Sequence, residues 1–334
     1  MPSQPNKQKS HNNRLLTKYL VLILWFVALA AAYANVQNIK DWIKLRGYTA
    51  PPAIVSLADQ DSMTGYGRKI LYVNHPQILA KDSFTNFCPS STAEQTIVLG
   101  CYHSGQSGIY LLNVSDARLN GVEQVTAAHE MLHGAYERLS NKDRQNIDAM
   151  LLNYYHNGLT DERIIKTIDD YRRTEPNDVV NEMHSVFGTE VQNLPAPLEN
   201  YYKRYFNNRQ QIAAFAARYQ SEFTSRQAAV ATYDKQLLSM KQQIDNLESD
   251  LKSKQQAIND QQQYLTNLKT SNVNAYNAAV PSFNAAIEAY NSEVQQVRSL
   301  INTYNQTVTT RNAIAFEENQ LVKDLSAPAA AINN

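Results

Sequence analysis

The sequence predicts an α+β fold: a small, mostly antiparallel sheet packs with a helical region, and an antiparallel coiled-coil hairpin follows. Three observations predict it. Short runs of aliphatic and β-branched residues occur between residues 54 and 112. Apolar residues recur at helical spacing from Val122 onward. A heptad repeat then occupies the last third of the chain.

The composition narrows the class of protein. The 334 residues exceed what one compact domain usually needs, so we expect two domains, or one domain with an extended element. The 31 basic and 31 acidic residues balance, so nothing in the charge points to a nucleic-acid partner. With only 10 glycines and 11 prolines, the chain favours helix over a sheet-rich fold.

The N-terminus predicts export from the cytosol. An apolar run at residues 19–34 follows a basic, polar segment, and flanking apolar residues extend it toward the ~20 that cross a bilayer. The basic residues place 1–18 on the cytoplasmic side. The end of the run, Ala32-Tyr33-Ala34, also resembles a cleavage site. A transmembrane signal anchor at 19–36 is favoured over a cleaved signal peptide, and either one leaves the remainder extracytoplasmic.

Short strand candidates come next. Residues 37–50 form an amphipathic connector that ends at Pro51-Pro52, because proline stops a helix. The candidate strands are 54–57, 70–73, 96–99 and 109–112. The segment Gly105–Gly108 predicts a hairpin connection between the last two strands.

Two cysteines, Cys88 and Cys101, lie in the exported part of the chain. In an oxidising compartment a lone pair at this separation favours a disulfide over a metal site. Reduced structural thiols are the alternative.

The helical region begins at Val122, from which apolar residues recur every three or four positions up to Leu139. Further helices are predicted at 141–156, 160–172 and 178–191. Pro195 and Pro197 then punctuate the chain, so we place one domain at 51–200.

The heptad repeat predicts a helical hairpin over residues 201–325, with a flexible tail at 326–334. Its a positions are Leu237, Ile244, Leu251, Ile258 and Leu265. Its d positions are Met240, Leu247, Lys254, Gln261 and Leu268, of which two are polar. A break at 270–281 precedes a second repeat, which runs through Phe283, Ile287, Tyr290, Val294, Val297, Ile301, Tyr304 and Val308. The hairpin would be a spacer, a homodimerisation element or an arm for a coiled-coil partner, or it would only stabilise the domain.

The residues that carry chemistry lie on the helix that starts at Val122. His129 and His133 are four residues apart, so their imidazoles project from one face and can reach a single metal ion. Glu130 lies between them and can take a proton from a water on that metal. This H-E-x-x-H pattern suits zinc, which binds imidazole and keeps one position open in catalytic sites.

A third protein ligand is expected in the segment Asn181-Glu182-Met183-His184-Ser185. This segment resembles the Asn-Glu-x-x-Ser motif of thermolysin-like gluzincins, and the resemblance implies a zincin-like catalytic region with Glu182 as a metal ligand. The metzincin branch is excluded, because Tyr136 and Leu139 replace its Gly and His. The gap from His133 to Glu182 is longer than in thermolysin, as in minimal gluzincins. Val186 also replaces the Asp that orients a ligand. Glu190 is the reserve ligand.

Donors to a developing oxyanion are also needed when an amide is cleaved. His184 and Tyr136 are the nearest candidates in sequence, and His103 beside the predicted hairpin is a third. An extended peptide could bind by adding to the sheet edge at strand 109–112.

Together these features predict an extracytoplasmic, membrane-tethered zinc endopeptidase that acts on a peptide or protein substrate. Zinc would lower the pKa of a bound water, and Glu130 would act as general base. The main rival is a coiled-coil interaction or scaffold protein with a vestigial or structural metal site. A cell-wall amide hydrolase is a third interpretation.

Overall fold

The computed structural model describes residues 7–89 and 97–326, and these form two compact units. The first unit holds the described residues up to Ser115 together with Asn120–Ala217. The second holds Asp116–Leu119, which includes a short 3-10 helix, and Arg218–Ser326.

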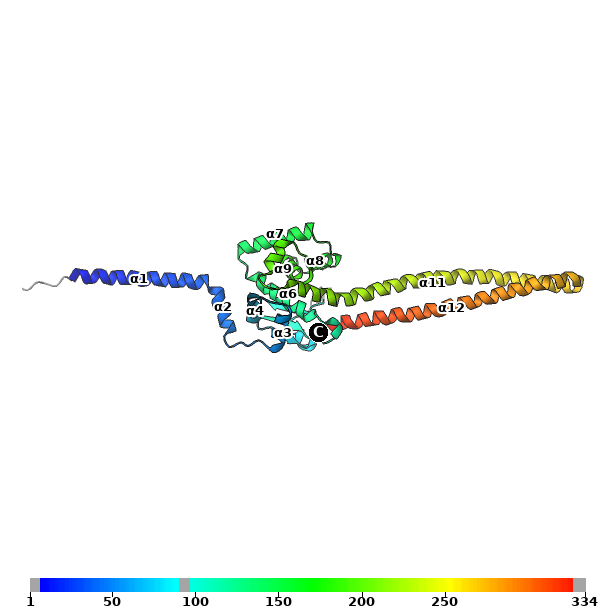
Figure 1. The fold of residues 1–334 in the computed structure, drawn as a ribbon, viewed down its shortest axis with the longest axis horizontal. Helices are drawn as coiled ribbons and strands as arrows, with labels where there is room; N and C mark the ends of the chain where they lie inside the picture. Colours follow the sequence, from blue (N-terminus) through cyan, green and yellow to red (C-terminus); the bar gives the residue numbers. More distant parts are fainter. Residues whose placement is uncertain (1–6, 90–96, 327–334) are drawn as a thin grey trace, which may run out of the picture. The chain divides into compact units, whose positions relative to one another are not determined.

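The first unit begins with two helices (Figure 1). Helix α1 (Lys7–Ala34) contains an 18-residue stretch, Thr17–Ala34, that is long and apolar enough to cross a membrane. The side chains of this stretch are exposed, which suits a membrane span or a signal sequence. Helix α2 (Val36–Leu45) follows one residue later, and all of it except Val36 lies within the predicted connector at 37–50.

The sheet has three strands: β1 (Gln77–Leu79), β2 (Gly100–His103) and β3 (Gly108–Leu112). Their order is β1-β3-β2, so β3 is central, and all its residues are buried. Strands β2 and β3 form the predicted antiparallel hairpin, with Cys101 opposite Tyr110. Strand β1 pairs with β3 in parallel, so the sheet is mixed rather than mostly antiparallel.

Three of the four strand predictions need correction. Residues 54–57 lie in helix α3 (Pro52–Gln60) and residues 70–73 lie in helix α4 (Gly65–Val73). Proline at the first turn of α3 and the Thr64 side chain, which accepts from Gly67 N–H, both favour helix starts. Residues 97–99 are not in a strand, since β2 starts at Gly100, and residue 96 lies outside the described residues. Only 109–112 is confirmed.

The disulfide between Cys88 and Cys101 is confirmed. It joins β2 to the segment that follows the short helix α5 (Lys81–Phe84). Both cysteines pack in a small apolar cluster with Phe84, Tyr110 and Leu112.

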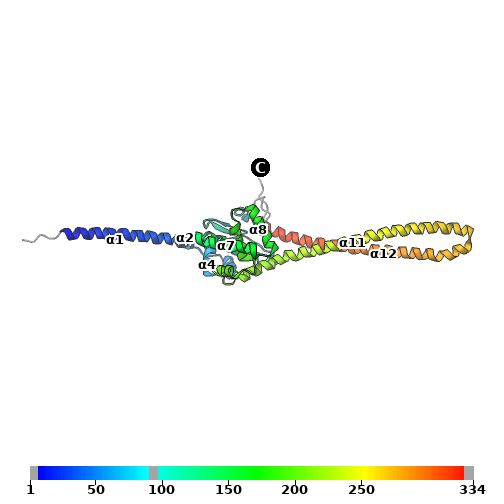
Figure 2. The same ribbon diagram turned by 90° about the horizontal axis from the view of Figure 1, so that it is seen from above.

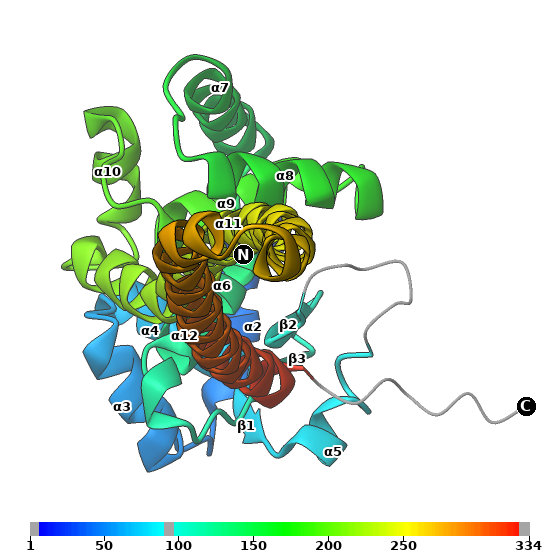
Figure 3. The ribbon, with the colours of Figure 1, turned by 90° about the vertical axis from the view of Figure 1, so that its right-hand side faces the viewer.

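The four helices predicted after residue 120 are confirmed to within a few residues. They are α6 (Val122–Glu137), α7 (Asn141–Asn157), α8 (Glu162–Thr174) and α9 (Val179–Glu190). Helix α6 contacts α9 on one side and β2 and β3 on the other (Figure 3). Gly188 permits the close approach, because a Cβ there would meet Leu132 Cδ1 at 2.4 Å and the Tyr202 ring at 2.8 Å.

The first unit continues past residue 200, where the sequence places a domain boundary, and ends at Ala217. Helix α10 (Ala196–Tyr202) and the start of α11 (Arg209–Ser271) both belong to it. The Arg209 side chain is buried, forms an ion pair with Glu199 and donates to the Val191 carbonyl. These contacts hold the first turns of α11 to the globular part.

The second unit consists mainly of the rest of α11 and helix α12 (Val273–Leu325). The break between them is a single residue, Asn272, whose side chain caps α12 by accepting from Ala275 N–H. Pro281 lies inside α12, so the predicted break at 270–281 is too long. Figure 2 shows α12 turning back along α11.

The predicted heptad residues of both helices are half-buried or buried, whereas most of the residues between them are exposed. Side chains pair across the two helices: Asp234 with Arg311, Lys254 with Glu293, and Gln261 with Ser282. As one residue number rises its partner's falls, so the helices run antiparallel. Knobs-into-holes packing between them stays a prediction.

The glycine at the α6–α9 contact generates a prediction. Gly188→Ala should destabilise the protein by about 1–3 kcal/mol, because the added methyl overpacks the contact with Leu132 and Tyr202. Gly65→Ala is the control, since a Cβ at Gly65 meets nothing within 4 Å. Chemical unfolding followed by circular dichroism measures both. Equal stability of the two variants would contradict the tight helix contact.

Candidate metal centre

Helix α6 supplies two imidazoles to one point. His129 and His133 lie one helical turn apart, with ring centroids 4.8 Å from each other. His133 is buried and His129 is half-buried, because most of α6 lies inside the unit. Both rings therefore line an interior position rather than the surface.

Helix α9 brings Glu182 to the same point. Its Oε1 lies 3.4 Å from His133 Nε2, and its Oε2 lies 3.5 Å from His129 Nε2. One ligand atom from each of the three residues lies within 4.8 Å of the other two. The group could hold a metal ion.

The donor atoms themselves fit a metal. Glu182 Oε2 is buried and makes no hydrogen bond within the described part of the chain. Burial alone would raise the pKa of Glu182, but His133 and His129 outweigh burial, so the pKa is lowered and the carboxylate stays charged. A buried anion with an unused oxygen beside two imidazoles is the chemistry of a metal ligand set.

Glu190, the reserve ligand, lies elsewhere. Its Oε2 accepts from Arg163 Nη1 at 2.6 Å, and it is not part of the group around His129 and His133. The arrangement brings the predicted Glu182 to the histidines and leaves Glu190 in an ion pair.

Glu130 is buried between α6 and the sheet. Burial raises its pKa to about 7; His133 opposes that rise, while Glu182 adds to it. The backbone of Tyr102 in β2 approaches the carboxylate and lowers the pKa in part. Gly100 allows this approach, since a Cβ there would lie 2.9 Å from Glu130 Oε1. The carboxyl group can hold or release a proton near neutral pH.

The predicted oxyanion donors are engaged in other contacts. His184 is fully buried, its Nε2 lies 2.9 Å from the Tyr201 hydroxyl, and burial lowers its pKa to about 3. The Tyr136 hydroxyl donates to Asp148 Oδ1 at 2.8 Å. His103 Nε2 lies 3.0 Å from the Phe87 carbonyl, near the disulfide. Their roles in catalysis stay predictions.

The sheet has two edge strands, β1 and β2, and β2 is the one whose edge lies near α6 and Glu130. The predicted edge at 109–112 is wrong, because β3 is paired on both sides. Among the described residues β2 pairs only with β3, and it contacts α6, the helix that carries Glu130. The edge of β2 therefore lies next to α6.

Sequence reasoning missed Tyr171 on α8. Its hydroxyl helps to lower the pKa of Glu182, and burial together with nearby carboxylates raises its own pKa well above the ordinary value. Glu175 and Asp178 also come within 4.8 Å of Glu182 as a second acidic group. No motif marks these residues, and only the proximity of the α8 end to α9 reveals them.

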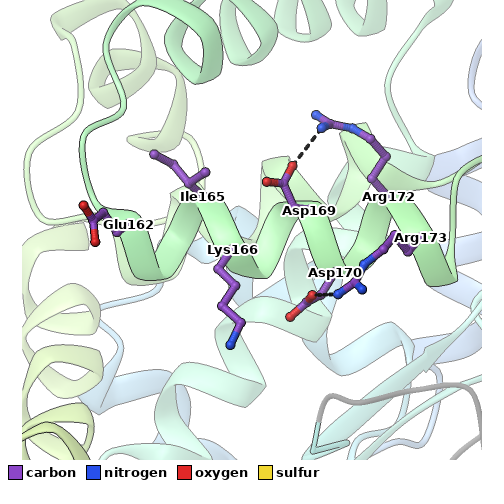
Figure 4. A pocket seen from close by; sticks show the side chains of 7 residues that line it. All are labelled: Glu162, Ile165, Lys166, Asp169, Asp170, Arg172 and Arg173. Atoms are coloured by element: carbon purple, nitrogen blue, oxygen red, sulfur yellow. Dashed lines mark hydrogen bonds and ion pairs between the residues drawn. The ribbon is translucent and has the colours of Figure 1, made fainter.

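A separate groove of about 500 Å³ lies along α8 (Figure 4). Within it Arg172 pairs with Asp169, and Arg173 pairs with Asp170. Its lining residues are Glu162, Ile165, Lys166, Asp169, Asp170, Arg172 and Arg173. The groove shares no residue with the group of His129, His133 and Glu182, so the two are separate sites.

Comparisons with known proteins give no relative: no family model, no curated protein and no solved structure matches the chain.

The ligand set generates a prediction about metal binding. Glu182→Ala should lower metal affinity by a large factor, because it removes one of three ligands. Glu190→Ala is the matched control on the same helix and should keep the metal, since Glu190 pairs with Arg163. Metal content after dialysis against a chelator, measured by mass spectrometry, distinguishes them. The opposite pattern would assign the ligand role to Glu190.

Proposed function

We propose that the chain is an extracytoplasmic, membrane-tethered zinc endopeptidase of the gluzincin type. The observation that carries the proposal is the convergence of His129, His133 and Glu182 on one point, with the buried Glu130 beside them. Two imidazoles and one carboxylate form a ligand set that zinc adopts in hydrolytic enzymes. The helix α1 supports the tether, and the disulfide supports the oxidising compartment.

Zinc, when bound, would polarise the scissile carbonyl and make a water more acidic. Glu130 would take the proton from that water and later deliver it to the leaving amine. Burial raises the pKa of Glu130 to about 7 in the metal-free site, and a bound cation would lower it toward the carboxylate form that acts as base.

Tyr171 is the donor that we assign to the developing negative charge. It lies beside Glu182, and its raised pKa keeps the hydroxyl protonated and able to donate. A donor already placed at the site stabilises charge without reorganisation during the reaction. His184 and Tyr136, whose polar atoms contact Tyr201 and Asp148, would instead position the surrounding helices.

The substrate would be an extended peptide along β2. This strand has an open edge and carries the contact to Glu130, so an added strand would pass close to the catalytic carboxyl. Gly100 keeps this approach free of a side chain. Main-chain hydrogen bonding would tolerate many sequences, which suits an endopeptidase.

An interaction role for α11 and α12 is the second candidate. The cross-helix pairs, such as Lys254 with Glu293, support an antiparallel coiled-coil hairpin that forms within one chain. Such an arm would act as a spacer, or it would bind a protein partner and bring the first unit to it. This role is compatible with hydrolysis and replaces it only if Glu130 proves dispensable.

The general-base role generates the central prediction. Glu130→Gln should reduce peptide hydrolysis by about 10²–10⁴-fold, because the amide cannot accept the proton. Zinc content should stay unchanged, since Glu130 is not in the ligand set. Cleavage of a quenched fluorescent peptide library measures activity. Wild-type function of the variant in cells, where a chain truncated of residues 218–326 is inactive, would favour the scaffold interpretation.

Tyr171 has a prediction of its own. Tyr171→Phe should lower kcat by roughly 10²–10³-fold with little change in KM, as expected for loss of one oxyanion donor. Tyr155→Phe is the control, because the Tyr155 hydroxyl donates to Asp169, outside the metal group. A change in KM alone for Tyr171→Phe would make it a substrate-binding residue instead.

A further inference from the structure

Helix α2 has an apolar face that the protein does not cover. Val36, Ile39, Trp42 and Ile43 are each between 43% and 63% exposed. Their spacing places them along one side of the helix. An amphipathic helix of a soluble domain normally turns this face toward the core, so α2 is oriented the opposite way.

The polar side of α2 is the one that docks on the protein. Asp41 is 1% exposed and forms ion pairs with Arg138 Nη2 at 2.9 Å and Lys69 Nζ at 2.8 Å. It also accepts from the side chains of Gln37 and Gln106. Burial would raise the pKa of Asp41, but the hydrogen bonds from Lys69 and Arg138 outweigh it and lower the pKa. These ion pairs of Asp41 with Lys69 and Arg138, called the clamp below, fix which face of α2 points outward.

The position of α2 in the chain identifies what covers its apolar face. The apolar stretch Thr17–Ala34 ends one residue before α2 begins. Lys40 and Arg46 add positive charge, and the Arg46 guanidinium lies 5.5 Å from the centre of the Trp42 ring. Tryptophan and basic residues directly after a span are typical of the headgroup region.

We propose that α2 lies in the interfacial region of the bilayer, with Ile39, Trp42 and Ile43 in contact with lipid. The proposal does not depend on the chemistry of the metal site. A second copy or a peptide would explain the apolar face alone. It would not explain the adjoining span and the basic residues.

The contacts of Asp41 also connect α2, and with it the proposed membrane contact, to the end of α6. Arg138 caps the C-terminus of α6, and Gln106 lies in the connection between β2 and β3. In that connection Gly105 N–H donates to Glu137, the last residue of α6. The bilayer surface, α2 and the end of α6 thus form one connected set of contacts, which holds the catalytic unit close to the membrane.

The test uses the full chain in vesicles of phosphatidylcholine and phosphatidylglycerol. Since the chain has 2 tryptophans, Trp25→Phe leaves Trp42 as the only one. Lipids brominated at different depths should quench Trp42, most strongly when the bromines lie ~5–10 Å below the headgroups. Trp42 fluorescence that is water-like and unquenched would overturn the proposal. Fluorescence shielded from acrylamide but unquenched by bromolipid would indicate a protein partner and would also overturn it.

Two further variants in the Trp25→Phe background separate lipid contact from folding. Ile39→Ser with Ile43→Ser should weaken quenching and leave the thermal unfolding midpoint unchanged, because both side chains are exposed. Asp41→Asn should keep the quenching and lower the midpoint, because it weakens the clamp. If the serine variant lowers the midpoint and keeps the quenching, the apolar face packs on protein and the proposal fails.

Discussion

The packing of α6 against α9 is the constraint on which the rest of the structure depends. The H-E-x-x-H spacing places His129 and His133 together through local helix geometry alone. Glu182 joins them only because α9 lies directly against α6. Gly188 sets that distance, since any side chain at this position would collide with Leu132. This glycine, which lies on the same helix as Glu182, therefore permits the approach that brings the three residues together.

Without a bound cation, burial of the two carboxyl groups at this site lowers the free energy of unfolding. Glu130 and Glu182 are both buried, and burying a carboxylate costs several kcal/mol unless it is paired. The two residues meet this cost differently: the pKa of Glu130 rises to about 7, whereas the histidines keep the pKa of Glu182 low. A cation held by the three ligands would offset the remaining penalty, so metal binding and the stability of the α6–α9 contact would be linked.

Local signals predicted much of this arrangement, and non-local ones did not. Helices α6 to α9 and the metal group follow from apolar periodicity and a short motif, and the heptad pattern matches the burial along α11 and α12. The strand predictions at 54–57 and 70–73 are wrong, because a short apolar run fits a helix or a strand equally well. The parallel β1–β3 pair and Tyr171 depend on contacts between distant segments, which no local pattern records.

The two polar d positions of the heptad repeat affect the register of the helix pair. Lys254 and Gln261 occupy d positions where an apolar residue would pack better. In the structure both find partners on α12, in Glu293 and Ser282. A helix pair with only apolar d residues could slide by one heptad at little cost, whereas a half-buried Lys254 separated from Glu293 would leave a buried carboxylate unpaired. The polar positions therefore favour one register, and with it an arm of one defined length. Apolar residues at the same positions would stabilise the helix pair more but would specify the register less.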